Sequence, residues 1–404
     1  MSDAARGPVG DPLLRWRDAF PILSRSTYLV SKSLGAMPRT VPGDLARYTE
    51  AWETLGVQAW AREWWELPVK MGDEIAPLIG AAAGEVAMVT NVTIGHAALV
   101  SALSYAAPRD TIVMTALDFP SVRYAVEGLA ARFGARVVVV PSDDGVSIDH
   151  DRLCAAIDER TRLVAISHVL FRSAHIMDAA RICAHATRMG ALVALDAYHS
   201  VGVMPVDVRA IGCDFYVGGV LKWLCGGPGG AFLWVSPETS AAVAPAFTGW
   251  QAHARPFAFE GEMAYADGAW RWLSGTPAIA QLYAGAAGPR IVREAGVAAI
   301  RAKSTRQTRR LIELADARGF AVSAPRDDAR RGGTVAFDVP HGYEVAQELL
   351  ARHVIVDYRP GAGIRVAPHF YTSDDELEVA VAMIDEILAS GAWQQHAGRR
   401  AIVT

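Results

Sequence analysis

Residues 196–235 read DAYHSVGVMPVDVRAIGCDFYVGGVLKWLCGGPGGAFLWV and place an acid, a lysine and a glycine-rich turn at the ends of apolar runs. The run 191–196 (ALVALD) ends at Asp196, and Lys222 follows the next run, just before the turn GGPGG at 226–230. Short apolar runs of this kind indicate buried strands. Because ligands bind at the carboxyl ends of strands in parallel sheets, this stretch predicts chemistry at one sheet edge.

The same alternation of apolar runs and helical patterns extends toward the N-terminus. It predicts an α/β fold, with a mostly parallel sheet that helices cover on both faces. We expect strands at 111–116, 136–140, 162–167, 191–196, 213–217 and 231–235, and helices at 121–133, at 178–189 and from Asp149 onward.

After about residue 274 the pattern changes to that of a smaller α+β unit. A long helix with an arginine-rich solvent face is expected up to residue 319. Strands are expected at 334–339, 353–358 and 363–366, and helices at 343–352 and 373–390. We therefore predict an N-terminal arm (1–25), a large domain (26–273) and a small C-terminal domain (274–404).

The composition is near neutral and rich in apolar residues. The 404 residues carry 39 Lys+Arg against 43 Asp+Glu, and 51% of them are hydrophobic. A chain of this kind without a basic stripe is expected to bind neither nucleic acid nor a membrane surface. The polar N-terminus is unlike a signal peptide, no apolar stretch is uninterrupted enough to span a membrane, and the four cysteines are scattered. These features predict a cytoplasmic protein, and the histidines and cysteines show no metal-ligand spacing.

Only four of the basic residues are lysines, and three of them, Lys32, Lys70 and Lys303, lie outside the pattern of strand ends. Lys222 alone leaves a predicted core strand near an acid, Asp196. A lysine in a desolvated pocket has a lowered pKa and can form a Schiff base. A neighbouring aspartate can keep a pyridinium nitrogen protonated, which makes pyridoxal 5'-phosphate (PLP) an electron sink.

On these residues the chain resembles the class V aminotransferase-fold PLP enzymes of fold type I, and among them the kynureninases. The stretch 196–235 resembles the segment that carries the cofactor lysine. Five more segments follow the family's order, and the resemblance runs from about residue 28 to residue 388. These segments are MVTNVTIGHAAL (88–99), DFPSVRYAVEGL (118–129), TGW (248–250), SGTPAI (274–279) and GIRVAPHFY (363–371).

The resemblance implies which residues surround the cofactor ring. Lys222 would carry the Schiff base, and Asp196 would pair with the pyridine nitrogen. His199 would lie beside that acid under the ring. Phe119 would stack on the open face of the ring.

The resemblance also implies residues for the cofactor phosphate and for the substrate. Thr93 and the backbone at Val92 would hold the phosphate at the start of a helix. Trp250 and Thr276 would reach the phosphate of the neighbouring subunit's cofactor, which implies a homodimer with active sites at the subunit interface. Arg365 would form a bidentate pair with the α-carboxylate of the amino-acid substrate.

The chain departs from the family just before the lysine. Val220 and Leu221 stand where kynureninases have a Ser-Tyr pair, whose tyrosine is thought to assist catalysis. Cysteine desulfurases carry a persulfide cysteine on a loop before the carboxylate-binding arginine, whereas no cysteine follows Cys225 here. Desulfuration is therefore not expected, and kynurenine hydrolysis is not assured.

We expect a PLP-dependent enzyme that acts on an α-amino acid through an external aldimine and a quinonoid, with Lys222 as the base for the Cα proton. A kynureninase-like hydrolase or lyase is the main hypothesis. The alternatives are a C–S β-lyase on an S-conjugated cysteine and an aminotransferase, each in secondary metabolism. An alternative of another class is a catalytically silent PLP-fold binding protein, which only Val220 and Leu221 support.

Overall fold

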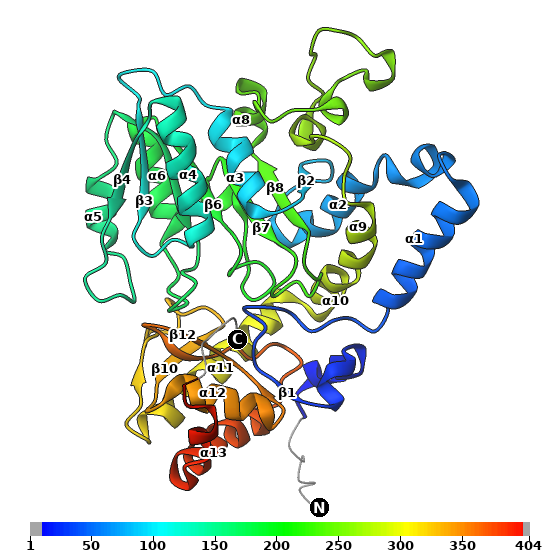
Figure 1. Cartoon of the computed structure of the whole chain (residues 1–404). Helices are drawn as coiled ribbons and strands as arrows, with labels where there is room; N and C mark the ends of the chain where they lie inside the picture. Colours follow the sequence, from blue (N-terminus) through cyan, green and yellow to red (C-terminus); the bar gives the residue numbers. More distant parts are fainter. Residues whose placement is uncertain (1–9, 399–404) are drawn as a thin grey trace, which may run out of the picture.

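The structure is a computed structural model that describes residues 10–398, so residues 1–9 of the predicted N-terminal arm lie outside the described part. A large α/β unit lies above a smaller unit in the view of Figure 1. The first described residues lie beside the smaller unit, which the C-terminal helices help to form.

Seven strands form the sheet of the large unit. All neighbouring pairs from β7 to β4 are parallel, whereas β8 is antiparallel to both of its neighbours. This confirms the predicted α/β class with a mostly parallel sheet. The spatial order is β2 (Val86–Val89), β8 (Ala231–Val235), β7 (Phe215–Gly219), β6 (Leu192–Asp196), β5 (Thr161–Ser167), β3 (Thr111–Thr115) and β4 (Arg136–Val140).

Helices cover this sheet, as Figure 1 shows, and most begin where a polar side chain can cap them. The side chains of Asn91, Asp149, Asp178, Asp207 and Ser236 each accept a hydrogen bond from a backbone N–H of the first turn. The helices are α3 (Val92–Ser101), α4 (Pro120–Phe133), α5 (His150–Ala155), α6 (Ala179–Met189), α7 (Val208–Ile211) and α8 (Pro237–Ala242).

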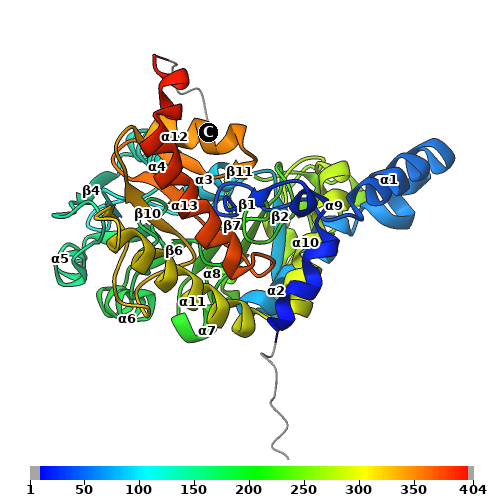
Figure 2. The ribbon, with the colours of Figure 1, turned by 90° about the horizontal axis from the view of Figure 1, so that it is seen from below.

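The smaller unit is a four-stranded antiparallel sheet packed with helices. The strand order is β12 (Asp357–Arg359), β13 (Gly363–Val366), β10 (Val335–Asp338) and β9 (Ala321–Val322). The helices are α11 (Val297–Asp316), α12 (Gly342–Ala351) and α13 (Asp374–Ser390), and Figure 2 shows α11 and α13 from below.

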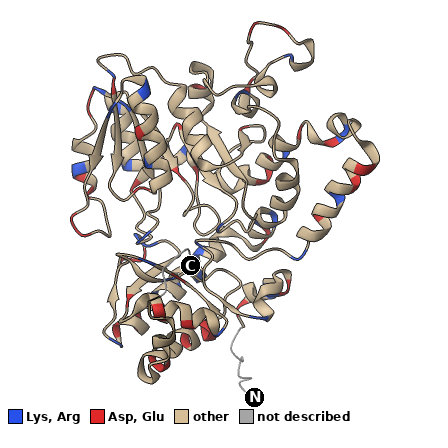
Figure 3. Ribbon diagram, viewed as in Figure 1, with Lys and Arg blue, Asp and Glu red and all other residues tan. Residues whose placement is uncertain are grey.

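Two arginines of α11, and a third just after its end, pair with acidic residues of α13. Arg306, Arg310 and Arg318 form ion pairs with Asp374, Glu378 and Asp385, respectively. Figure 3 shows acidic and basic residues mixed along the helices of both units. Exposed pairs of this kind contribute little stability singly, so packing of the apolar faces is the main force that holds these helices together.

The predicted single helix from 274 to 319 is wrong, because the chain forms three helices there. They are α9 (Ile279–Gly285), α10 (Ala287–Ala295) and α11. Gly296, with φ 87°, ends α10 in a conformation that favours glycine. The predicted strand 353–358 also divides, into β11 (Val354–Ile355) and β12, which belong to different sheets.

Segments that are far apart in the sequence pack side by side. β1 (Thr27–Tyr28) pairs in parallel with β11, while α9 contacts α1 (Val41–Leu55) and α10 contacts α2 (Leu67–Ile79). Figures 1 and 2 show α1 projecting outward. The short helices are η1 (Pro12–Ala19), η2 (Pro21–Ser24), η3 (Trp60–Trp64), η4 (Trp250–Ala252), η5 (Pro256–Ala258), η6 (Gly268–Trp272) and η7 (Ala392–His396).

The domain boundaries at 25/26 and 273/274 stay predictions. Within residues 10–398, no helix has the length and apolar character needed to cross a membrane.

Asp118 ties two neighbouring strands at the edge of the sheet where Asp196 ends β6. Its buried carboxylate accepts hydrogen bonds from Thr115 N and Ser167 N, each at 2.7 Å, and so joins the ends of β3 and β5. We predict that Asp118→Ala lowers the free energy of unfolding by about 2–4 kcal/mol, because two buried N–H groups lose their acceptor.

Denaturant unfolding monitored by circular dichroism measures this change. The matched variant Asp118→Asn keeps the shape and one acceptor oxygen, so it should lose less. A loss of less than about 1 kcal/mol for the alanine variant would show that Asp118 does not hold these strands together.

Candidate active site

Lys222 lies just beyond the end of β7, as the pattern of strand ends predicts. Its Nζ is 2.8 Å from His199 Nε2 and 4.2 Å from the centroid of the Tyr198 ring. Burial lowers the pKa of Lys222 to about 7, with Asp196 opposing this shift and Arg365 adding to it. Burial and the charge of Lys222 hold the pKa of His199 well below its ordinary value, so a neutral imidazole faces the amine. A lysine in this state is in part a free amine near neutral pH.

The close packing under Lys222 requires a glycine. A Cβ on Gly219 would collide with the ring of Tyr198, whose face lies against the Lys222 amine. Gly219 therefore lets the tyrosine ring approach the end of β7.

Asp196 is the last residue of β6, and its carboxylate is buried with an exposed fraction of 4%. Within residues 10–398 the only hydrogen bond to this carboxylate comes from Tyr198 N, at 2.8 Å. Burial raises its pKa, whereas the nearby His96 and Lys222 oppose that shift. A buried carboxylate with one hydrogen bond has unused acceptor capacity, which a positively charged N–H donor would satisfy.

Phe119 lies above the same amine, at the start of α4. The centroid of its ring is 5.6 Å from Lys222 Nζ, and Phe171 packs edge-on against it with ring centroids 5.2 Å apart. The Phe119 side chain is 40% exposed, which is more than a core phenylalanine shows. Phe119, Tyr198 and Lys222 therefore lie together.

Val92 and Thr93 are the first two residues of α3, a helix that follows β2. The Asn91 side chain caps Ile94 N, so the N–H groups of Val92 and Thr93 point out of the helix without an intrahelical partner. Exposed N–H groups at a helix N-terminus favour an anion such as a phosphate.

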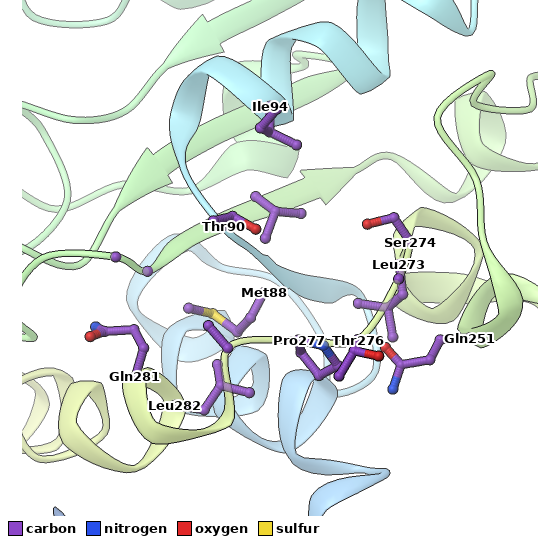
Figure 4. Close-up of a pocket in the computed structure, with 15 residues that line it drawn as sticks. Met88, Thr90, Ile94, Gln251, Leu273, Ser274, Thr276, Pro277, Gln281 and Leu282 are labelled. Atoms are coloured by element: carbon purple, nitrogen blue, oxygen red, sulfur yellow. The ribbon is translucent and has the colours of Figure 1, made fainter.

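Thr276 borders two hollows and Trp250 borders one of them, and Lys222 lines neither. Thr276 borders a pocket of about 120 Å³ that Figure 4 shows, between the start of α3 and the segment that precedes α9. None of Lys222, Asp196 and His199 lines this pocket. Trp250 and Thr276 also border a second, apolar hollow of about 540 Å³.

Gln251 is a buried polar residue in the wall shared by both hollows. Its exposed fraction is 3%, and neither its amide nitrogen nor its amide oxygen has a partner within residues 10–398. A buried amide without partners is uncommon, so this wall has hydrogen-bonding capacity that the described chain leaves unused.

Arg365 is a buried residue of β13 and is already paired. Its Nε donates to Asp357 Oδ1 at 2.8 Å and its Nη2 donates to Asp357 Oδ2 at 2.5 Å, while Nη1 donates to the carbonyl of Phe171 at 2.9 Å. Lys32 Nζ also donates to Asp357, at 2.6 Å. The charges of Arg365, Lys32 and Asp357 all reach His199, so this group lies near the lysine centre.

The sequence patterns did not reveal Tyr198, Lys32 and Asp357. Tyr198 lies between Asp196 and His199 in the sequence, and only that position could have indicated that it belongs to the site. Lys32 and Asp357 are 325 positions apart, so no local pattern links them.

The two departures before the lysine differ in their surroundings. Val220 is completely buried, and a Cβ on Gly226 would meet its side chain, so Val220 packs in the core beneath the turn 226–230. Leu221 is partly exposed. Of the two departures from the kynureninase pair, therefore, only Leu221 changes a partly exposed side chain beside Lys222.

Comparison with known proteins shows which family the chain belongs to. The family model of class V aminotransferases matches residues 28–368. The kynureninase of Burkholderia pseudomallei (strain K96243) is 33% identical over 397 residues, which cover 95% of this chain and 94% of that protein. The kynureninase of Pseudomonas fluorescens is 33% identical over 402 residues with the same two coverages.

Solved structures show the same fold. A cysteine desulfurase from Thermococcus onnurineus NA1 superposes with a TM-score of 0.81 at 22% identity, covering 96% of this chain and 100% of that one. The cystine C–S lyase C-DES superposes with a TM-score of 0.82 at 22% identity, covering 90% of this chain and 98% of that one. The chain belongs to the class V aminotransferase family of PLP-dependent enzymes and has their fold type I.

Proposed function

We propose that this chain is a PLP-dependent hydrolase or lyase that acts at the β carbon of an α-amino acid, in the manner of a kynureninase. The observation that carries the proposal is the Lys222 amine, which lies between Phe119 and Tyr198, 2.8 Å from His199 Nε2. The near-complete match to kynureninases at 33% identity supports it.

The residues of the site fit the cofactor group by group. The buried carboxylate of Asp196, with its single hydrogen bond, suits a protonated pyridine nitrogen. The free N–H groups of Val92 and Thr93 suit the phosphate, and the ring of Phe119 suits a stacking contact. When bound through Lys222, PLP supplies an electron sink for the bonds of the substrate Cα.

Lys222 and His199 act as a pair. The lowered pKa of Lys222 leaves part of the amine unprotonated near neutral pH, so Nζ can attack a carbonyl carbon and can later take the Cα proton. The neutral His199 ring holds Nζ in place through the 2.8 Å contact. The negative charge of Asp196 would favour a proton on the pyridine nitrogen of a bound cofactor.

Arg365 binds the α-carboxylate of the substrate and thereby fixes the orientation of Cα toward the ring. Its terminal nitrogens lie at the contact between the two units, where Nη1 meets the carbonyl of Phe171. Phe171 in turn packs against Phe119, so the same loop connects the carboxylate site with the stacking ring.

Leu221 is the one feature that favours a second reaction. It puts an apolar side chain where kynureninases place a tyrosine, and so removes a hydroxyl that could relay a proton during Cβ–Cγ hydrolysis. Elimination of a thiolate from Cβ does not need such a group at the γ position, so a C–S β-lyase is the second candidate.

The chain is proposed to work as a cytoplasmic homodimer, with Trp250 and Thr276 facing the partner's cofactor. Exposed aromatic side chains at Trp250, Phe257 and Phe259, together with the unpartnered amide of Gln251, support a covered surface here. Sedimentation analysis that finds only monomers would contradict this arrangement.

A substrate screen tests the reaction. Purified enzyme with PLP is incubated with kynurenine and with S-conjugated cysteines, and the products are identified by mass spectrometry. We expect kynurenine to give alanine and an arylcarboxylic acid, with water supplying the hydroxyl of the acid and a proton for the β carbon. Lys222→Ala should lower the rate by about a hundredfold or more, because it removes both nucleophile and base.

The matched variant Leu221→Tyr refines this screen. It restores the missing hydroxyl and should raise Cβ–Cγ cleavage relative to thiol release. Release of thiol, pyruvate and ammonia from S-conjugated cysteines, without cleavage of kynurenine, would replace the hydrolase with the C–S lyase. No turnover of either class would contradict both.

The lowered pKa of Lys222 predicts the pH dependence of cofactor uptake by the apoenzyme. The attacking amine must be unprotonated, so the rate of Schiff-base formation should rise as the pH passes through about 7 and then level off. Stopped-flow absorbance at a series of pH values measures the rate, with Lys222→Ala as the control. A rate that keeps rising up to about pH 10, as for an ordinary lysine, would contradict the desolvated site.

A further inference from the structure

Lys32 is completely buried beside the lysine turn, although it lies far from Lys222 in sequence. It belongs to a segment after β1 that contacts both units. Within that segment Gly35 N donates to the carbonyl of Leu221 at 2.8 Å, and a Cβ on Gly35 would collide with the carbonyl of Lys222. The segment that carries Lys32 is therefore fixed against the turn that carries Lys222.

Asp357, the first residue of β12, accepts hydrogen bonds from this segment. Its buried carboxylate accepts from Lys32 Nζ at 2.6 Å, from Ser33 Oγ at 2.6 Å and from two nitrogens of Arg365. Burial alone would raise the pKa of Asp357, but the charges of Lys32 and Arg365 hold it well below its ordinary value. Asp357 is therefore a permanent anion inside the site.

The side of Arg365 formed by Nε and Nη2 is fully used by Asp357. The guanidinium has further N–H groups on Nη1 and Nη2. Among residues 10–398 these groups bond only to the carbonyl of Phe171 at 2.9 Å and to Ser33 Oγ at 3.4 Å. A substrate carboxylate that binds Arg365 must use this remaining edge. Asp357 thus decides which edge of the guanidinium faces the substrate.

The arrangement raises a problem of charge, because Asp357 and a bound substrate carboxylate would both pair with Arg365. The guanidinium of Arg359 also lies 3.5 Å from Asp357 Oδ2, but its side chain is partly exposed. Burial makes an unbalanced anion costly. The ammonium of Lys32 supplies a further, completely buried positive charge, at the same Asp357 Oδ1 that accepts from Arg365 Nε. Burial and Arg365 lower the pKa of Lys32, whereas Asp357 favours its protonated form and accepts its hydrogen bond.

We propose that Lys32 is a positioning residue for the substrate carboxylate. Its positive charge offsets the negative charge of Asp357, so that Arg365 keeps its orientation and its positive charge stays available to the substrate. The inference rests on the proposed role of Arg365 and adds a residue that does not touch the substrate. It predicts that the loss of Lys32 weakens the binding of ligands with an α-carboxylate and leaves the binding of ligands without one unchanged.

The test compares two ligands that differ only in the carboxylate. Calorimetric titration of the purified holoenzyme gives Kd for L-phenylalanine and for 2-phenylethylamine. Lys32→Met should raise the Kd of L-phenylalanine about tenfold or more and change the Kd of 2-phenylethylamine less than about twofold. Lys32→Gln, which keeps a donor but loses the charge, should shift in the same direction and serves if the methionine variant does not fold.

A double variant and a surface control separate this role from general damage. Lys32→Met with Asp357→Asn removes both charges of the pair, so it should recover much of the lost affinity for L-phenylalanine. Lys70→Met, at a lysine whose side chain is 60% exposed, should change neither affinity.

Equal weakening of both ligands, or no weakening of either, would overturn the role of Lys32. These outcomes are distinguishable from failure of the proposed function, because calorimetry does not require turnover. If L-phenylalanine and the amine bind alike in every variant, including wild type, then the carboxylate role of Arg365 fails together with that of Lys32.

Discussion

The amine of Lys222 lies 2.8 Å from His199 Nε2 and 4.2 Å from the Tyr198 ring centroid, where burial disfavours its charged form. The proposed chemistry depends on this desolvated amine, because only an unprotonated amine attacks a carbonyl or accepts a proton. Close packing around Lys222 maintains this desolvated state of the amine. Gly219 lets the tyrosine ring approach, and Gly35 lets the N-terminal segment lie against the lysine turn.

The two units supply different parts of the site. The large sheet brings Asp196, Lys222 and the start of α3 to one edge, because β2, β6 and β7 run in the same direction. The small unit adds Asp357 and Arg365 from neighbouring antiparallel strands, which pair Asp357 directly with Arg365 in register. The segment with Lys32 and Ser33 joins the two. A substrate held by Arg365 is therefore placed relative to Lys222 by the contact between the units.

The fold and the centre of the site follow from local sequence patterns, whereas the carboxylate group does not. Asp196 and Lys222 end short apolar runs, and a sheet edge gathers such residues whatever the details of packing. Phe119 and Arg365 needed the family resemblance, because a phenylalanine before a helix and one arginine among many carry no local signal. Lys32 and Asp357 depend on pairing across 325 positions. The breaks of the predicted long helix had visible signals, at Gly296 after α10 and at Gly285 and Gly288-Pro289 around Ala286.

The most direct test of the central claim is the location of the cofactor adduct. Borohydride reduction of the holoenzyme converts a Schiff base into a stable secondary amine, and peptide mapping by mass spectrometry then identifies the modified lysine. The account predicts one modified peptide, which contains Lys222, and none in Lys222→Ala. An adduct on Lys32, Lys70 or Lys303, or a protein with no reducible adduct, would contradict it.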